Sequence, residues 1–293
     1  METVSLPSKG VEKGNSYRRT LLKRFLRHRL ALVGCISFLA IIIIALIAPF
    51  IAPHHPFTIY SSYLPPGSEH WLGTDQSGRD VFSRLLYASR ISLIVGVGTV
   101  FIYIIIGTIL GALAGFFGGW LDMLVMRITD VFLSFPYLMV ILVLVSIVGP
   151  NLSNIILVLG ILGWPGVARL VRGNVLSLKN SEFVRSGIAL GFSKWRLLFN
   201  HILPNSIAPI LVNATFGVAF AILTEASLSF LGMGVQPPTA SWGNMLSEAQ
   251  SISILADRPW LWLPPGIMIV IVVLSINFIG DGIRDAMDPK NSQ

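Results

Sequence analysis

The sequence predicts an all-α integral membrane protein with six transmembrane helices, and three observations support that prediction. First, 54% of the 293 residues are hydrophobic and only 12% are charged, whereas soluble domains carry about 25% charged residues. Second, the chain contains six apolar runs, most of them long enough to cross the roughly 30 Å hydrocarbon core of a bilayer. Third, lysine and arginine are concentrated on one side of the predicted topology.

The first apolar run, at residues 30–51, contains no charged residue and ends just before Pro53. It predicts a transmembrane helix over 29–52. A polar and basic tail, 1–28, comes before this helix, and an extracytoplasmic loop, 53–90, follows it.

The 53–90 loop contains a group of charged residues and a pair of adjacent histidines. Its charged residues recur at spacings of four and five, which indicates a salt-linked amphipathic helix along the outer surface: Asp75, Arg79, Asp80 and Arg84. The neighbours His54 and His55 would face different ways in any regular element. We therefore expect loop residues there rather than a metal site.

The remaining five apolar runs form a predicted transmembrane core over 91–281. They lie at residues 91–117, 123–148, 154–171, 206–231 and 261–279. Two loops interrupt the core, at 179–205 and at 232–260, and a polar tail, 282–293, follows it. The run at 91–117 carries five glycines, and small residues let neighbouring helix backbones approach closely in lipid.

The distribution of positive charge predicts the orientation. With six spans, both termini and the 179–205 loop lie on one side, which carries 17 of the 21 Lys and Arg residues. The opposite side carries only Arg79, Arg84, Arg90 and Arg258. The positive-inside rule therefore places both termini and this loop in the cytoplasm. Because the positive charge follows topology, it does not indicate nucleic-acid binding.

The 179–205 loop is a charged island that predicts two short amphipathic helices hinged at Gly191. Apolar residues recur at helical spacing on both sides of the hinge: Phe183, Val184, Gly187, Ile188, Phe192, Trp195, Leu198 and Phe199. Pro204 then ends the local pattern or opens the next helix. Such a loop indicates a docking surface for a soluble partner, the alternative being an ordinary basic loop. Membrane-length runs on both sides disfavour a DNA-binding helix-turn-helix.

The sequence contains no recognisable catalytic motif. No Gly-Lys pair occurs, so a Walker A phosphate loop is absent. Motifs of the G-x-S-x-G, Cys-x-x-Cys and H-E-x-x-H types are absent as well. The single cysteine, Cys35, excludes an intrachain disulfide and is expected to be a small buried apolar residue. We predict that the chain is not an enzyme and that the energy for any uphill transport comes from another subunit.

Ionisable residues within apolar runs are candidates for function, because charge in hydrocarbon is costly. Glu225 lies beside three hydroxyl residues, Thr224, Ser227 and Ser229. We expect local pairing of this carboxyl, with a proton relay as the alternative. Arg127 and Asp130 lie one helical turn apart near a membrane boundary, so their mutual pairing is the simplest expectation.

The spacing within the 179–205 loop resembles the EAA loop of bacterial ABC-importer permeases. Glu182 precedes Gly191 by nine positions, and His201-Ile-Leu-Pro204 follows. This resemblance implies contact with an ATP-binding subunit, through these residues: Glu182, Phe183, Ser186, Gly187, Gly191, Phe192, Trp195, His201 and Pro204. One departure is Arg185, which stands where the family usually has an acid.

The resemblance extends from about residue 25 to 289 and points to the C-type permease subunit of oligopeptide, dipeptide and nickel ABC importers. The segments that resemble it include FLRHRLALVG, HWLGTDQSGRDVFSRLLYASRISL, GWPGVARLVRGNVLSLK, TEASLSFLGMGVQPPTASWGNML and GDGIRDAMDP. The sister B-type subunit usually lacks the segment seen here at 71–75. The resemblance implies a type I importer permease fold in the bacterial cytoplasmic membrane.

The resemblance also implies function and partners. The expected partners are a B-type permease, two ATP-binding subunits that hold ATP and Mg, an extracytoplasmic solute-binding protein and membrane lipid, with no nucleic acid and no cofactor in this chain. The expected activity is import of di- or oligopeptides by alternating access. Import of nickel or a metal chelate is the alternative. A proton-coupled secondary transporter is more remote, since it calls for an inverted repeat and titratable residues in both halves.

Overall fold

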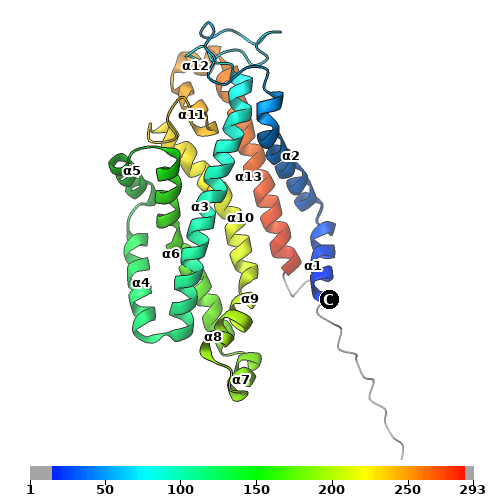
Figure 1. The fold of residues 1–293 in the computed structure, drawn as a ribbon, viewed down its shortest axis with the longest axis vertical. Helices are drawn as coiled ribbons and strands as arrows, with labels where there is room; N and C mark the ends of the chain where they lie inside the picture. Colours follow the sequence, from blue (N-terminus) through cyan, green and yellow to red (C-terminus); the bar gives the residue numbers. More distant parts are fainter. Residues whose placement is uncertain (1–14, 288–293) are drawn as a thin grey trace, which may run out of the picture.

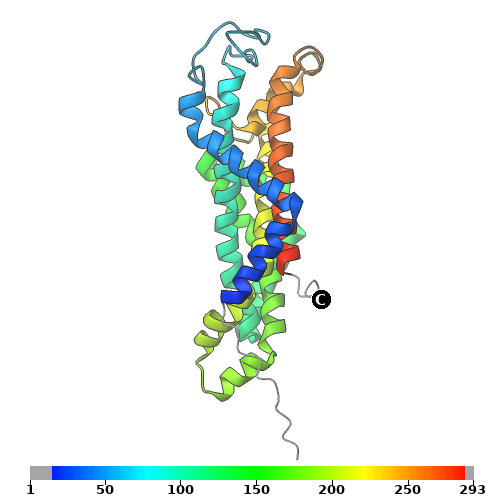
Figure 2. The ribbon, with the colours of Figure 1, turned by 90° about the vertical axis from the view of Figure 1, so that its right-hand side faces the viewer.

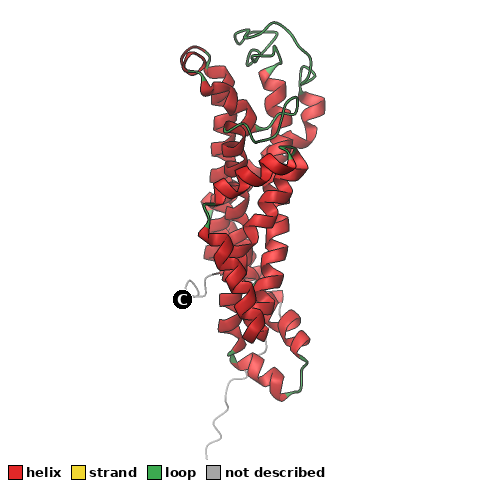
Figure 3. Cartoon of the chain, turned by 90° about the vertical axis from the view of Figure 1, so that its left-hand side faces the viewer, coloured by secondary structure: helices red, strands yellow, loops and turns green. Residues whose placement is uncertain are grey.

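The computed structural model describes residues 15–287, and this part of the chain is a bundle of helices (Figures 1 and 3) with no strand among the described residues. The helices, in chain order, are α1 Asn15–Arg27, α2 Arg29–Ile51, α3 Val81–Phe117, α4 Gly119–Ser134, α5 Tyr137–Val148, α6 Leu152–Lys179, α7 Glu182–Ala189, α8 Lys194–Arg196, a π-helix Leu197–Ile202, α9 Leu203–Asn205, α10 Ile207–Phe230, α11 Trp242–Ser247, a 3-10 helix Glu248–Gln250, α12 Ile252–Asp257 and α13 Pro259–Met287.

Five helices are long and apolar enough to cross a membrane, namely α2, α3, α6, α10 and α13. The pair α4 and α5 provides a sixth span that is bent by 89°. The prediction of one continuous helix over 123–148 is therefore wrong at its middle. Pro136 is the reason, because a proline disfavours helical backbone in the residue before it. Phe135 accordingly has φ −96° and ψ 145°. The chain is a multi-pass membrane protein.

The third helix begins ten residues earlier than the apolar run suggested. Asp80 caps its first turn, since Oδ1 accepts a hydrogen bond of 2.7 Å from the backbone N–H of Ser83. The charged residues of 81–90 thus belong to α3 itself, which spans 37 residues. The fourth predicted run is likewise too short, because α6 continues to Lys179.

Close packing of α3 against α6 forms the centre of the bundle. This is the most extensive contact between two helices, followed by those of α13 with α2 and with α10. Gly111 lies directly against the backbone of Ala168, where a side chain would collide with the carbonyl oxygen. Gly107 and Gly115 face α6 in the same way. The glycine spacing therefore serves close helix packing, as predicted.

The two ends of the bundle differ. We call the end towards which α1 and the last turns of α13 point the terminal end, and Figure 2 shows these two segments close together there. The opposite end, which we call the loop end, carries residues 53–80 together with α11 and α12 (Figure 1). The helices α7 and α8 project beyond the rest of the bundle at the terminal end.

Candidate functional site

The turn of the 179–205 loop is built around Gly191. This residue has φ +76°, a left-handed conformation that favours glycine. Its N–H donates to the carbonyl of Ile188 at 2.9 Å, and the N–H of Phe192 donates to that of Gly187 at 3.0 Å. These two bonds form a Schellman motif, which ends α7 and satisfies carbonyls that a helix end would leave free. The predicted hinge at Gly191 is therefore present.

After the turn, the second half of the loop is a short helix that passes into a π-helix. Ser193 caps α8 by accepting a hydrogen bond of 3.3 Å from the N–H of Arg196. The π-helix widens the coil and points Leu197, Leu198 and Ile202 into the core. Phe192 thus lies close to His201 across the loop, with ring centroids 5.5 Å apart.

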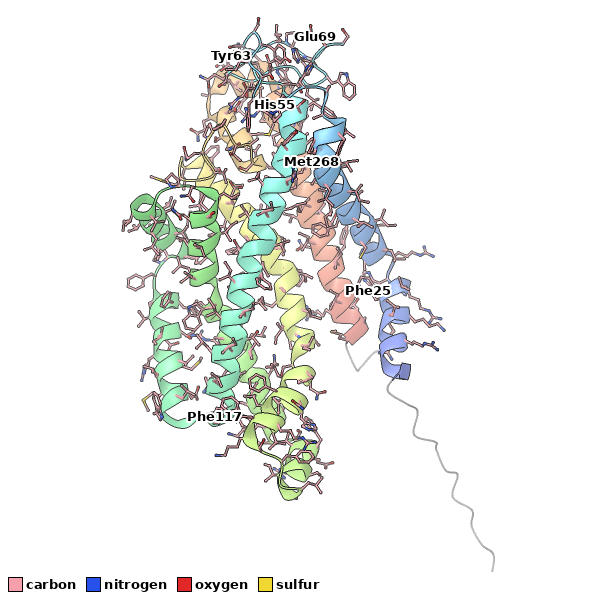
Figure 4. All side chains as sticks on the ribbon, in the orientation of Figure 1. Phe25, His55, Tyr63, Glu69, Phe117 and Met268 are labelled. Atoms are coloured by element: carbon pink, nitrogen blue, oxygen red, sulfur yellow. The ribbon has the colours of Figure 1, made fainter. Side chains whose placement is uncertain are left out.

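Two contacts fasten the loop to the end of α3. Lys179 Nζ donates a hydrogen bond of 2.6 Å to the carbonyl oxygen of Phe116. The ring of Trp195 meets that of Phe117 edge to face, at 5.3 Å between centroids. Figure 4 labels Phe117 at the terminal end of α3, beside α7 and α8. The loop is thereby held at a fixed angle to the longest helix of the bundle.

The loop buries only part of its apolar surface. Val184 and Gly187 of α7 face inward, and a Cβ on Gly187 would lie 2.8 Å from Leu197. Large apolar side chains beside them are exposed by 43% to 73%, namely Phe183, Ile188, Leu190, Trp195 and Phe199. A projecting helix pair with this much uncovered apolar surface has the character of a docking surface.

The nine predicted contact residues divide between exposed and inward-facing positions. Six are exposed: Glu182, Phe183, Ser186, Gly191, Trp195 and Pro204. Gly187 is buried, while Phe192 and His201 are half-buried. The last two stack on one another, so they shape the loop from inside. The predicted set missed Leu190, an exposed leucine directly before the hinge that the helical spacing did not include.

The pairing of Arg127 with Asp130 is wrong. Asp130 Oδ1 instead accepts a hydrogen bond of 2.6 Å from Arg169 on α6. Both side chains of this pair are 54% exposed. Arg127 is exposed and makes no ion pair with any residue in the described range. Helix packing explains the difference, because α4 lies beside α6 and turns Asp130 towards it.

A second pair joins the same two helices nearer the terminal end. Arg172 donates two hydrogen bonds to the carboxylate of Asp122, from Nε at 2.5 Å and from Nη2 at 2.6 Å. Fifty residues separate the two positions, so no local spacing could have revealed the pair. Bidentate guanidinium–carboxylate pairs fix geometry as well as adding energy.

Glu225 is buried and its pairing is partly as expected. Oε1 accepts hydrogen bonds from the hydroxyls of Ser229, at 2.7 Å, and of Ser241, at 2.8 Å. The expected neighbours Thr224 and Ser227 instead donate to carbonyls of their own helix. Ser241 is the partner that the sequence did not indicate. It comes from the segment before α11, so this carboxylate ties α10 to the loop end.

The charged residues predicted to form a solvated surface helix are buried, and that prediction is wrong. Asp75, Arg79, Asp80 and Arg84 are each at most 8% exposed, and residues 75–80 are not helical. Arg84 pairs with Asp75 and donates a hydrogen bond of 2.9 Å to Glu248. Asp75 and the distant Glu248 together offset the charges of Arg79 and Arg84, and this pairing lets these side chains leave water.

The histidines at the loop end belong to a hydrogen-bonded network. His70 Nδ1 lies 2.8 Å from Asp80 Oδ2, and His54 Nδ1 lies 3.0 Å from the hydroxyl of Tyr60. Candidate ligand atoms of His54, His70 and Asp80 lie within 4.8 Å of one another. Both histidines and Asp80 also have polar partners within the described residues, since His54 Nε2 lies 2.9 Å from the carbonyl oxygen of Glu69 and Asp80 caps α3.

The membrane-length helices define a multi-pass membrane protein, and the projecting 179–205 loop leaves large apolar side chains uncovered at the terminal end. Residues 107–293 match the family described as the binding-protein-dependent transport system inner membrane component. Residues 16–66 match the N-terminal TM domain of oligopeptide transport permease C. The chain belongs to this family of transport permeases, and the predicted type I permease fold is confirmed.

Curated relatives resemble the chain over nearly its whole length. The dipeptide transport system permease protein DppC of Alkalihalophilus pseudofirmus is 44% identical, over 93% of this chain and 90% of the relative. The glutathione transport system permease protein GsiD of Pectobacterium atrosepticum is 42% identical, over 93% and 91%. The oligopeptide transport system permease protein OppC of Bacillus subtilis is 41% identical, over 95% and 92%.

Proposed function

We propose that the chain is the C-type permease subunit of an ATP-driven importer of di- or oligopeptides. It forms half of the translocation pathway together with a B-type sister subunit. Two ATP-binding subunits, which hold the ATP and Mg, and an extracytoplasmic solute-binding protein complete the assembly. The site of action is the bacterial cytoplasmic membrane, with both termini in the cytoplasm, as the excess of Lys and Arg on that side favours.

The observation that carries this proposal is the uncovered apolar surface of the 179–205 loop. Trp195, Leu190 and Ile188 are all more than half exposed at the terminal end. On the cytoplasmic side, they suit a cleft in an ATP-binding subunit. The contacts of Lys179 and Trp195 with the end of α3 give the loop a rigid link to the bundle.

Alternating access follows from this link. Movement of the ATP-binding subunits displaces the loop, and the loop moves α3, α6 and α10 as packed bodies rather than by gradual bending. Peptide cargo is favoured because relatives carry names for dipeptide and oligopeptide transport. The chain itself then needs no bound cofactor.

The test is uptake in proteoliposomes by the purified complex of the two permease subunits and the two ATP-binding subunits, with the solute-binding protein added separately. We expect labelled dipeptide to accumulate only with ATP and the solute-binding protein. Nickel or a nickel chelate serves as the competing cargo. Accumulation of nickel without peptide would favour the metal-importing alternative. Peptide uptake driven by a proton gradient without ATP would reject the proposed mechanism.

A further inference from the structure

A cavity of about 360 Å³ opens where the break between α4 and α5 faces α6 and α10. Its volume is in the range typical of small-ligand pockets. Most of the lining is apolar, but three polar side chains contribute to it: Tyr103, Tyr137 and Asn213. Each comes from a different helix, and each lies in a segment that crosses the membrane.

The polar atoms of these three side chains are available to a ligand. None of them hydrogen-bonds to another residue within 15–287, and none is among the fully buried polar atoms without a partner. They therefore remain accessible from the cavity. A polar group facing hydrocarbon without a partner is costly. Water or polar cargo in this space would supply the missing hydrogen-bond partners.

Two glycines make room for the Tyr103 ring. A Cβ on Gly163 of α6 would lie 2.7 Å from the ring, and a side chain on Gly217 of α10 would collide with the hydroxyl. Tyr103 is thus wedged between two helices with its hydroxyl at the cavity wall. The ring of Tyr137 lies 5.8 Å from that of Phe220, and both residues line the cavity.

The rim of the cavity carries the exposed ion pair. Leu133 and Gly166 line the cavity. Asp130 lies one helical turn from Leu133, and Arg169 lies one helical turn from Gly166. Exposed charges within a spanning segment almost always face water or another protein group rather than lipid. The Asp130–Arg169 pair therefore indicates that this face of the bundle is turned away from hydrocarbon.

A second cavity, of about 410 Å³, continues the first towards the terminal end. The two share Asn213 and Phe216 of α10. The second is lined at its far end by Arg284, close to the end of α13. The shared residues make a groove that runs along α10 from the middle of the bundle to the terminal end.

We propose that Tyr103, Tyr137 and Asn213 form a subsite for the peptide backbone of the cargo on its way through the membrane. A peptide bond carries one donor and one acceptor, and tyrosine hydroxyls and an asparagine amide can each donate and accept. The Asp130–Arg169 pair presents both signs of charge to the charged ends of a short peptide. This inference rests on the proposed function and assigns residues to its pathway.

The first test compares Tyr103→Phe and Tyr137→Phe with Tyr87→Phe in the complete complex in proteoliposomes. Tyr87 lies on the same helix as Tyr103 but near the loop end, at a different cavity. Loss of one hydrogen bond to cargo should lower the maximal rate of dipeptide uptake about 3- to 10-fold. We expect Tyr87→Phe to stay within about twofold of wild type and ATP hydrolysis to continue in all three variants.

The second test measures access directly. In a Cys35→Ser background, Asn213→Cys should react with a water-soluble maleimide, and saturating dipeptide should slow this reaction at least about threefold. A mixture of free amino acids is the control and should not protect. Absence of labelling would mean that lipid or the sister subunit covers this face, which overturns the inference.

The outcomes separate the two proposals. A wild-type complex that imports no peptide would overturn the proposed function and this subsite together. A wild-type complex that imports peptide, with Tyr103→Phe and Tyr137→Phe importing at the same rate, would overturn the subsite alone.

Discussion

Arg84 on α3 donates a hydrogen bond of 2.9 Å to Glu248, which lies 164 residues further along the chain. The same guanidinium pairs with Asp75, and Arg79 also reaches this group through its hydrogen bond of 2.9 Å to Asp75. Two segments of the loop end, one before α3 and one after α11, are therefore joined by a single buried arginine. This cluster fastens the outer layer to the helix bundle.

Replacing Arg84 should destabilise the fold strongly. Arg84→Ala leaves buried carboxylate charge without its main partner, which costs about 3–5 kcal/mol. Glu248→Gln is the matched control, because Asp75 still pairs with Arg84 and the glutamine side chain keeps an acceptor oxygen. We expect it to lower the free energy of unfolding by only about 1 kcal/mol. Thermal unfolding of the purified complex in detergent measures both. Equal melting temperatures for the two variants would contradict the central role of Arg84.

Substitution of Gly191 should uncouple transport without preventing membrane insertion. No atom lies within 4 Å of a Cβ placed there, so the cost is backbone strain at φ +76° and not a collision. Gly191→Val should therefore disrupt the turn and reduce peptide uptake at least about tenfold. Gly191→Asn should retain most activity, because asparagine tolerates this left-handed conformation. Uptake at the wild-type rate by Gly191→Val would show that the turn is not needed for coupling.

Glu225 should act as a structural tie and not as a proton carrier. Glu225→Ala removes the acceptor of two serine hydroxyls and leaves a cavity, at a cost of about 2–4 kcal/mol. Glu225→Gln keeps the volume and one acceptor, so it should cost only about 1 kcal/mol and leave ATP-driven uptake intact. The check is uptake by Glu225→Gln with and without a proton ionophore. Loss of uptake in Glu225→Gln, together with loss of uptake in wild type on adding the ionophore, would support the relay instead.

The two ion pairs between α4 and α6 should differ in their contribution to stability. Asp122→Asn disrupts a bidentate and partly buried pair, for which we expect a loss of about 1.5–3 kcal/mol. Asp130→Asn removes a partner from a pair that is more than half exposed, so its effect should stay below about 1 kcal/mol. Thermal unfolding of the two variants under identical conditions provides the comparison. A larger loss in Asp130→Asn would reverse this assignment.

Much of the fold could be predicted from the sequence because lipid imposes simple requirements. A spanning segment must be long, apolar and helical, which identifies α2, α10 and α13 directly. The break at Pro136 was missed because apolar residues continue on both sides of this proline, and membrane-spanning helices can tolerate a proline. The early start of α3 was missed because its first ten residues include Arg84 and Arg90, and the charge of Arg84 is compensated by residues outside the helix.

The candidate site was predictable where its chemistry is local. Gly191 and the apolar spacing around it lie within one short segment, and the structure contains the turn they indicate. Partners separated by long stretches of sequence were not predictable, as Asp122 with Arg172 and Glu225 with Ser241 illustrate. The wrongly predicted Arg127–Asp130 pair has the same cause, since sequence spacing favours neighbours on one helix over partners on the next.

By itself, the sequence determined that this chain crosses a membrane several times and carries one projecting loop with a glycine turn, because hydropathy and backbone conformation are properties of short segments. Only the tertiary structure decided which charges are buried together at the loop end, and that tyrosine and asparagine side chains from three helices meet around one cavity. Those relationships depend on helix packing, which brings together residues that no spacing along the chain connects.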